Sequence, residues 1–270
     1  MTCMKNLQKP YALITGATGG LGKAFVYEVA SRGNNVIVTG RSEEKLASLK
    51  AELVQTFPDI QIYAYTADLT DEKSRNALYE RIKEDDKKIS LLVNVAGADI
   101  QKAFEEYTQE KIAFQCRVNF EASVSLCRFA IDNRATRLEI INISSVSGIY
   151  PMPYFAIYSA TKSALTSFSV ALREEVKRKN IAVTAILPGA MPTREDIKKQ
   201  IKGQGLWGKL AVKSPQWVAK YSLKAVAKNK SKAIPGFWNK LMRVFTALLP
   251  TAWKLKFIAK RWSKITKDAF

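Results

Sequence analysis

Residues 11–22 read Tyr-Ala-Leu-Ile-Thr-Gly-Ala-Thr-Gly-Gly-Leu-Gly, a pattern from which the rest of the fold can be predicted. Residues 11–15 predict a short apolar strand, and residues 23–31 have helical composition. The glycines between them let backbone approach backbone, and exposed N–H groups at the start of a helix can bind a pyrophosphate. A glycine turn alone is also typical of a purely structural turn, so its interpretation depends on the rest of the chain.

Strands and helices continue to alternate after this turn. Further strands are predicted at residues 35–39, 60–66, 89–95, 137–145, 181–187 and 232–235, and helices at 43–55, 71–84, 109–132, from 158 onward and at 215–228. Helices of this length between strands imply right-handed crossovers and a parallel sheet. The sequence therefore predicts one α/β domain over residues 1–236, a Rossmann-type doubly wound parallel sheet with helices on both faces.

The distinctive motifs all fall where a predicted strand ends. They are Thr15 to Gly22, Asp68-Leu69, Asn94 to Gly97, Ser145 and Pro188-Gly189. The carboxyl ends of parallel strands meet at one edge of a sheet, where ligands bind in a crevice. Unrelated structural turns would occur equally at the other edge, so this distribution indicates a binding site.

The chemistry is predicted at Ser145, Tyr158 and Lys162. Tyr158 and Lys162 lie one helical turn apart, and an ammonium group near a phenol lowers the pKa of the phenol from its usual value of about 10. Such a tyrosine can donate or accept a proton near neutral pH, while the serine hydroxyl holds the substrate oxygen. Two other Tyr-x-x-x-Lys pairs, beginning at Tyr79 and Tyr107, have no serine at a strand end thirteen residues earlier.

The composition excludes several kinds of site. The 270 residues include no histidine, so histidine-based triads and histidine metal ligands are excluded, and we expect no metal. Three widely spaced cysteines indicate a reducing compartment without a disulfide framework. Cys116 and Cys127 lie three turns apart on one face of the predicted helix 109–132, and we expect small core or interface residues there. No apolar run is long enough to span a membrane, so we expect a cytoplasmic or peripheral protein.

The net charge of +19 is concentrated near the C-terminus. Residues 198–270 contain 18 basic side chains and one acidic one, whereas the first 197 residues contain 25 and 23. Apolar residues at helical spacing before and after Pro250 predict two basic amphipathic helices in an appendage of residues 237–270. These helices either pack against the body or a partner subunit, or lie on an anionic membrane surface. We expect no nucleic acid partner.

The motifs together resemble those of classical short-chain dehydrogenases/reductases over residues 9–236. The family's Thr-Gly-x3-Gly-x-Gly motif matches Thr15 to Gly22, and its Asn-Asn-Ala-Gly motif matches Asn94 to Gly97, with Val95 replacing the second asparagine. The family's active-site residues fall on Asn119, Ser145, Tyr158 and Lys162. Its Pro-Gly-x3-Thr stretch, which contacts the nicotinamide, falls on Pro188, Gly189 and Thr193.

The resemblance implies a role for each of these residues. Tyr158 would protonate the carbonyl oxygen as hydride arrives from the nicotinamide, and Ser145, favoured over Ser144 by its spacing, would position that oxygen. Lys162 would bind the nicotinamide ribose, and Asn119 would hold a water in the proton relay or act only as a helix-kink residue. The residues expected to contact the cofactor are Gly16, Thr18, Gly20, Leu21, Gly22, Arg41, Ser42, Asp68, Leu69, Asn94, Ala96, Gly97, Tyr158, Lys162, Pro188, Gly189 and Thr193.

The charge after the second strand distinguishes the two nicotinamide cofactors. A carboxylate there would bind the ribose 2′-hydroxyl of NAD and repel a 2′-phosphate, whereas Arg41 and Ser42 supply a cation and a hydroxyl. NADP(H) is therefore the expected cofactor. Many relatives that prefer NADP also carry a basic residue inside the glycine loop, where this chain has Thr18 and Gly19.

Residues 190–214 contain three glycines around Trp207 and are expected to form a hinged cover over the substrate. Trp207, Leu206, Tyr154 and Phe155 either line a site for a bulky hydrophobic substrate or belong to the core. The predicted function is an NADP(H)-dependent oxidoreductase, a homodimer or homotetramer, that interconverts a hydrophobic ketone and a secondary alcohol. Hydroxysteroid, bile-acid-like and 3-oxoacyl substrates fit this prediction. The alternative is a non-catalytic dinucleotide-binding or membrane-surface scaffold protein.

Overall fold

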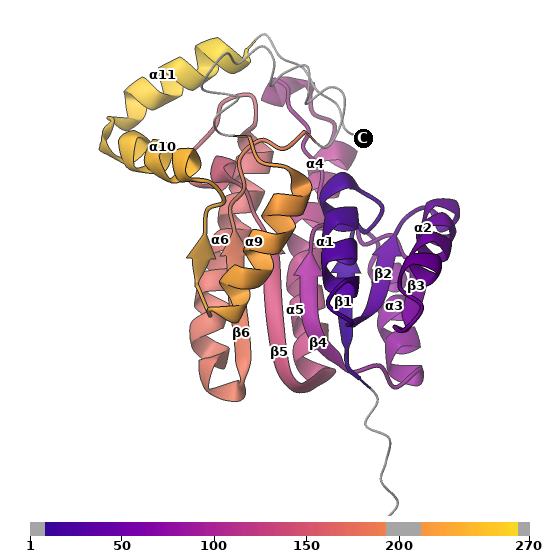
Figure 1. Cartoon of the computed structure of the whole chain (residues 1–270). Helices are drawn as coiled ribbons and strands as arrows, with labels where there is room; N and C mark the ends of the chain where they lie inside the picture. The colour runs from indigo at the N-terminus through magenta and orange to yellow at the C-terminus, as the bar shows by residue number, and fades with distance from the viewer. Residues whose placement is uncertain (1–8, 193–211, 264–270) are drawn as a thin grey trace, which may run out of the picture.

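A computed structural model describes residues 9–192 and 212–263 of the chain. At its centre is a seven-stranded sheet in the order β3-β2-β1-β4-β5-β6-β7, and every neighbouring pair of strands is parallel (Figure 1). The strands are β1 (Tyr11–Thr15), β2 (Asn35–Gly40), β3 (Ile62–Thr66), β4 (Ile89–Asn94), β5 (Arg134–Ile143), β6 (Ile181–Ile186) and β7 (Lys232–Ala233). The strand order reverses between β1 and β4, which makes that position the topological switch point of a doubly wound sheet. The predicted fold class is confirmed.

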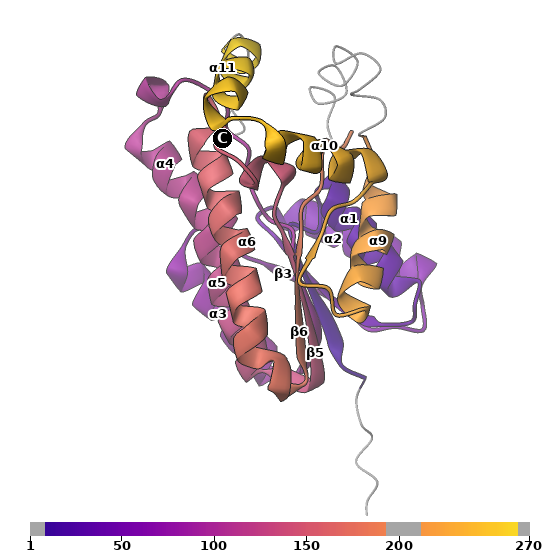
Figure 2. The same ribbon diagram turned by 90° about the vertical axis from the view of Figure 1, so that its left-hand side faces the viewer.

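Helices cover both faces of the sheet (Figure 2). One face carries α1 (Gly20–Ala30), α2 (Glu43–Thr56) and α9 (Pro215–Ala227), and the other carries α3 (Glu72–Glu84), α4 (Gln109–Cys116), α5 (Ala122–Asp132) and α6 (Ala156–Val176). Four short helical segments are η1 (Phe104–Glu106), η2 (Arg117–Glu121), η3 (Val146–Gly148) and η4 (Lys177–Lys179). The last two helices, α10 (Phe237–Leu248) and α11 (Thr251–Trp262), lie across the carboxyl edge of the sheet.

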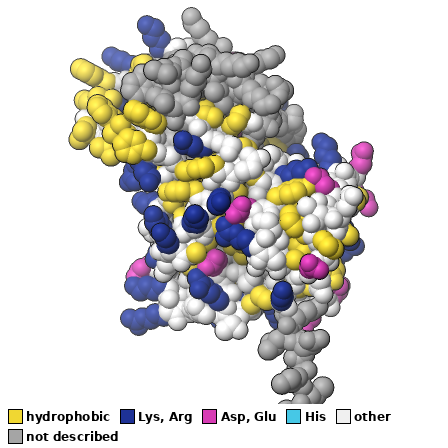
Figure 3. Space-filling model, viewed as in Figure 1, with side chains coloured by type: hydrophobic (Ala, Val, Ile, Leu, Met, Phe, Trp, Pro, Cys, Tyr) yellow, Lys and Arg dark blue, Asp and Glu magenta, His cyan; other side chains and the backbone are white. Residues whose placement is uncertain are grey.

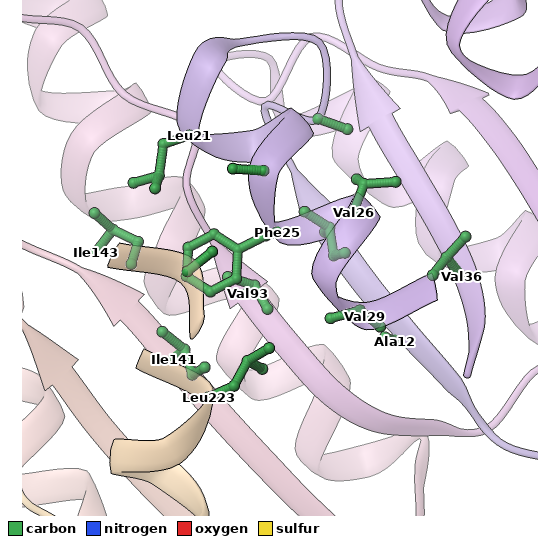
Figure 4. Packing of buried hydrophobic residues seen from close by; sticks show 14 of the residues in the cluster. Ala12, Leu21, Phe25, Val26, Val29, Val36, Val93, Ile141, Ile143 and Leu223 are labelled. Carbon is green, nitrogen blue, oxygen red and sulfur yellow. The ribbon is translucent and has the colours of Figure 1, made fainter. Parts of the chain in front are cut away.

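The alternation of side chains along each strand divides the core into two layers. On β1, Ala12 and Ile14 pack with Phe25 of α1 in a cluster that lies beneath α1, α2 and α9 (Figure 4). Tyr11 and Leu13 belong to the opposite cluster, which lies against α3 and α5. Because a central parallel strand is covered on both faces, its near-continuous apolar sequence is what this fold requires.

The predicted continuous helix 109–132 is wrong in one respect. A π-helical segment, η2, separates α4 from α5, and its wider turn rotates the residues that come after it. Cys116 is consequently exposed while Cys127 is buried, so the two thiols do not share a core face. Burial raises the pKa of Cys127 to about 12, as expected for an inert core thiol.

The other elements agree with the sequence prediction except at their ends. β3 begins at Ile62, β5 begins at Arg134, and β7 is limited to two residues. The two predicted tail helices are α10 and α11. None of the helices within residues 9–192 and 212–263 has the length and apolarity needed to span a bilayer. Most of the predicted substrate cover, including Trp207, lies outside the described residues.

Candidate active site

Tyr158 and Lys162 lie one turn apart on α6. The Tyr158 ring stacks on the Phe155 ring with 4.3 Å between centroids, and Lys162 Nζ lies 5.7 Å from the centroid of the Tyr158 ring. Lys162 is buried and donates a hydrogen bond of 2.9 Å to the carbonyl oxygen of Ile143. Burial lowers the pKa of Lys162 to about 8, and the negative charge of Asp99 opposes this shift. The structure thus holds a cation beside a phenol at the end of β5.

The two serines after β5 differ in their partners. Ser144 Oγ donates a hydrogen bond of 2.7 Å to the carbonyl oxygen of Lys162 and lies 2.7 Å from Thr166 Oγ1. Ser145 Oγ accepts a hydrogen bond of 3.1 Å from the backbone N–H of Ser147. Ser144 therefore fastens the strand to α6, and the hydroxyl proton of Ser145 can still be donated to a substrate oxygen.

Asn119 lies within the π-helical segment η2 and is fully buried. Its Oδ1 accepts a hydrogen bond of 2.8 Å from the N–H of Ala98, and its Nδ2 donates to the carbonyl oxygen of Ala98 at 2.9 Å and to Thr161 Oγ1 at 3.3 Å. Because both amide protons are committed, only the second lone pair of Oδ1 remains for a water. The structure thus gives Asn119 a loop-anchoring role, and the water relay stays a prediction.

Gly97 joins this group because it allows close approach. A Cβ atom at Gly97 would lie 2.8 Å from Asn119 Oδ1 and 3.4 Å from Lys162 Nζ. The loop after β4 therefore passes directly over the side chains of η2 and α6. Of the predicted catalytic residues, Asn119 and Lys162 meet at this loop, and Tyr158 lies beside Lys162.

The glycine turn after β1 has the geometry of a phosphate-binding loop. Gly16 has a φ of +59°, and a Cβ atom at Gly22 would overlap the carbonyl oxygen of Gly16. Gly19 precedes α1, and no side chain caps this helix start. The side chain of Leu21 is buried in the core, so only its backbone faces the turn. Uncapped N–H groups at a helix N-terminus fit a pyrophosphate, which is the group that a dinucleotide would place here.

The side chain of Asn94 joins two neighbouring strands of the sheet. It is buried, and its Nδ2 donates a hydrogen bond of 2.8 Å to Asn142 Oδ1 on the neighbouring strand β5. The loop after β4 is positioned by Thr15, whose Oγ1 accepts hydrogen bonds from the N–H groups of Val95 and Ala96 at 3.0 and 3.1 Å. These bonds use backbone atoms, which explains why valine is compatible with position 95.

A cavity of about 520 Å³ lies where β2 and β3 end beside α4. Its lining residues are Arg41, Asp68, Thr70, Gln109, Glu110, Ala113, Phe114 and Arg117. The Arg41 guanidinium carbon lies 5.7 Å from the centroid of the Phe114 ring. Sequence reasoning predicted Arg41 and Asp68 but missed Phe114 and Arg117, because only the packing of α4 brings them to this edge.

Three further predicted cofactor residues already have structural partners. Asp68 Oδ1 accepts hydrogen bonds from the N–H and hydroxyl of Thr70, at 2.9 and 2.8 Å. The carbonyl oxygen of Leu69 accepts a hydrogen bond of 2.7 Å from buried Arg75. Ser42 caps α2 through its Oγ, which leaves its hydroxyl proton for a phosphate oxygen.

The loop after β6 lies between η3 and α10. The carbonyl oxygen of Pro188 accepts a hydrogen bond of 3.0 Å from the N–H of Val146. A Cβ atom at Gly189 would lie 2.8 Å from Oδ1 of Asn239 on α10, whose Nδ2 donates to the carbonyl oxygen of Pro235 at 2.8 Å. Sequence reasoning missed Asn239. Thr193, the last predicted cofactor residue, lies outside the described residues.

Helix α11 packs against the surroundings of Tyr158. Buried Ile258 belongs to a cluster with Met152 and Phe155, and Trp262 and Tyr158 are partly buried against it. The predicted packing of the appendage on the body therefore applies to this face of α11. The other prediction, a membrane surface, concerns the faces that remain exposed.

Comparison with known proteins shows to which family the chain is similar. Residues 10–202 match the family described as short chain dehydrogenase. Among curated relatives, the very-long-chain 3-oxoacyl-CoA reductase of Bos taurus is 31% identical over 192 residues, which cover 68% of this chain and 60% of that protein. The inactive hydroxysteroid dehydrogenase-like protein 1 of Homo sapiens is 29% identical over 249 residues, covering 90% of this chain and 73% of that protein.

A solved structure shows the same fold with a cofactor bound. The short-chain dehydrogenase from Sphingobium yanoikuyae in complex with NADPH has a TM-score of 0.75 and 28% identity, and the match covers 88% of this chain and 94% of that one. The family match covers more than half of the chain and includes the glycine turn, Asn119, Ser145, Tyr158 and Lys162. The chain therefore belongs to the short-chain dehydrogenase family of oxidoreductases.

Proposed function

We propose that the protein is an NADP(H)-dependent oxidoreductase that interconverts a hydrophobic ketone and the corresponding secondary alcohol. The observation that carries this proposal is the buried Lys162 ammonium beside the Tyr158 ring, at the edge of the sheet where Ser145 follows β5. A cation in a desolvated site stabilises a phenolate more strongly than it would in water. The pair is thus suited to proton transfer near neutral pH.

Each residue has a defined part in the reaction. Bound NADPH would supply the hydride. Tyr158 donates its phenolic proton to the developing alkoxide, and Ser145 donates a hydrogen bond to the same oxygen. Lys162 stabilises the resulting phenolate and would bind the nicotinamide ribose. In the oxidative direction, the phenolate of Tyr158 accepts the proton of the alcohol.

The preference for NADP(H) is supported by charge and shape. Arg41 lies in the cavity at the ends of β2 and β3, where a 2′-phosphate would place its negative charge. Ser42 contributes a hydroxyl, and the uncapped start of α1 fits the pyrophosphate. The similar Sphingobium yanoikuyae dehydrogenase was solved with NADPH.

The proposed substrate is bulky and apolar, either hydroxysteroid-like, bile-acid-like or a 3-oxoacyl chain. Tyr158 lies in a cluster with Met152, Phe155 and Ile258, so an apolar group can be desolvated beside the reacting carbonyl. The bovine relative is named as a reductase of very-long-chain 3-oxoacyl-CoA. We also propose that the protein is a homodimer or homotetramer in the cytoplasm.

Replacing Tyr158 by phenylalanine tests the proton donor. Tyr158→Phe removes the phenolic hydroxyl but keeps the ring that stacks on Phe155. We expect kcat for NADPH-dependent ketone reduction to fall by at least about 100-fold, with NADPH affinity and melting temperature unchanged. Tyr150→Phe, in the same cluster, is the matched control and should retain activity within about threefold. Activity of Tyr158→Phe within about tenfold of wild type would show that another group donates the proton.

The competing function is a dinucleotide-binding or scaffold protein without turnover. It has support from a human relative that is named as inactive. The two functions are distinguished by a screen of steroid, bile-acid, acyl-thioester and small ketones with NADPH. Tight NADPH binding without oxidation in the presence of every ketone would favour the scaffold.

A further inference from the structure

The helix pair α10 and α11 exposes an apolar surface that the rest of the described chain does not match. Large apolar side chains that are exposed here are Phe237, Met242, Val244, Phe245, Leu248, Leu249, Trp253 and Phe257. Within residues 9–192 and 212–236, only Val54, Phe104 and Trp217 are comparable. Figure 3 shows hydrophobic side chains gathered at the corner occupied by α10 and α11. Contiguous patches of this kind mark interaction surfaces.

The helix pair is fastened to the body on its other side. Ile258 of α11 is buried against Met152 and Phe155, and Asn239 of α10 lies against Gly189. In contrast, Phe257, adjacent to Ile258 in the sequence, is 69% exposed. The exposed apolar surface therefore belongs to helices that are packed on the body by their inner faces.

The charge of this surface limits its partners. Residues 237–263 contain six basic side chains and no acidic one. Lys240, Arg243, Lys256 and Lys260 are exposed on the same helices as the apolar groups. Dimerisation through this surface would bring two strongly cationic surfaces together, and these repel each other. A nucleic acid would pair with the basic side chains but would leave the apolar side chains in contact with water.

We propose that the outer surface of α10–α11 binds an anionic lipid bilayer. Apolar and aromatic side chains enter the interface between headgroups and acyl chains, while the basic side chains pair with lipid phosphates and carboxylates. Neither helix is required to cross the bilayer. Because the inner face of α11 packs beside Tyr158, docking places the active site next to the lipid, from which an apolar substrate could enter. This route for the substrate rests on the proposed function, whereas lipid binding itself does not.

The test is co-sedimentation of the full-length protein with phosphatidylcholine vesicles, with or without phosphatidylserine. We expect binding at low ionic strength only when phosphatidylserine is present, and release as salt screens the charges. The double variants Phe245→Ser/Leu248→Ser and Arg243→Glu/Lys256→Glu should each weaken binding by more than about tenfold. Val54→Ser and Lys50→Glu, which change exposed groups on α2, are matched controls and should bind like wild type.

Several outcomes would overturn the proposal. These are no binding to phosphatidylserine vesicles at low ionic strength, equal binding to uncharged vesicles, or equal losses in the test and control variants. A change of oligomeric state in Phe245→Ser/Leu248→Ser, with no vesicle binding by wild type, would assign the surface to a second copy. Ketone reduction in vesicle-free buffer is measured on the same variants, so that loss of lipid binding and loss of catalysis are separated.

Discussion

Ser144 and Ser145 show how adjacent residues of one type take different tasks. The Ser144 hydroxyl is bound to the carbonyl oxygen of Lys162, so it fixes the distance between β5 and α6. Within the described residues, the Ser145 hydroxyl makes one hydrogen bond, which it accepts from the backbone N–H of Ser147. The alternation of side chains along a strand predicts that one of the two faces the crevice, and the contacts agree with Ser145 as that residue.

Arg41 is expected to determine cofactor preference. Replacing Arg41 by aspartate puts a negative charge where the 2′-phosphate of NADPH would lie, while NADH has a hydroxyl there. We expect kcat/KM for NADPH to fall by more than about 50-fold and kcat/KM for NADH to change by less than about threefold. Steady-state kinetics with both cofactors measure the ratio.

Arg117 provides the control for this prediction because it lines the same cavity as Arg41. If Arg41 alone contacts the 2′-phosphate, Arg117→Ala should change kcat/KM for both cofactors by a similar factor. If Arg41→Asp keeps the preference for NADPH over NADH and Arg117→Ala loses it, the residue that contacts the 2′-phosphate is Arg117.

Lys162 is expected to reduce stability while it serves the site. Its folded-state pKa of about 8 lies below the usual lysine value, so the folded protein holds the charged form at a cost. This cost is complete below about pH 8 and decreases between about pH 8 and pH 10.5, where the unfolded chain binds more protons than the folded one. Lys162→Met should therefore raise the unfolding free energy by about 1–2 kcal/mol near neutral pH, less at higher pH.

Chemical denaturation at two pH values measures this effect. Lys50→Met, on the exposed side of α2, is the control and should leave the unfolding free energy unchanged at both. A Lys162→Met variant that is less stable than wild type near neutral pH would mean that the ammonium and its bond to Ile143 stabilise the fold.

Among the helices and strands, the π-helical segment η2 is the one that positions Asn119 at the site. A π-helical turn interrupts the regular hydrogen bonds of the helix, and Asn119 occupies it with its side chain committed to Ala98. The sequence suggested either a relay residue or a helix kink at this position. The structure shows a π-helical turn here, and Asn119 is held in it by Ala98 and Thr161, which are far away in the sequence.

Helix α11 is expected to act as a wall of the substrate site. Ile258→Ala removes apolar atoms that contact Met152 and Phe155 beside Tyr158. We expect KM for a bulky ketone to rise by about tenfold, with a change of less than about twofold for a small ketone that does not reach this cluster. Phe257→Ala, on the outer face of the same helix, should leave both KM values unchanged. Equal effects on KM for both ketones would show that α11 does not line the substrate site.

At the scale of the molecule, the fold follows from patterns that are local in the sequence. Apolar runs of strand length, the glycine turn and the helices between strands were sufficient to predict the sheet and the edge that carries the motifs. The ends of β3 and β5 differ from the prediction by two or three residues because hydrogen-bonded pairing with neighbours decides where a strand begins.

Contacts between distant segments were the part that the sequence did not reveal. Phe114 and Arg117 reach the Arg41 cavity only through the placement of α4. Asn94 fits a cofactor motif, yet it binds Asn142 of a neighbouring strand. Helical spacing predicted α11, but the spacing carries no information on which surface Ile258 would meet. Each of these contacts joins segments that are distant in the sequence, so it depends on how the elements pack.

The packing of α11 over the surroundings of Tyr158 has a consequence for the length of the substrate. Ile258 packs inward while its neighbour Phe257 is exposed, and an α-helix with its side chains is only about 10 Å in diameter. Among the described residues, a single helix therefore forms this wall. A long chain bound beside α11 would have its carbonyl end enclosed and its far end projecting past the protein. Selection would then act on the few carbons nearest the carbonyl, and homologues that differ only at the distant end would be accepted alike.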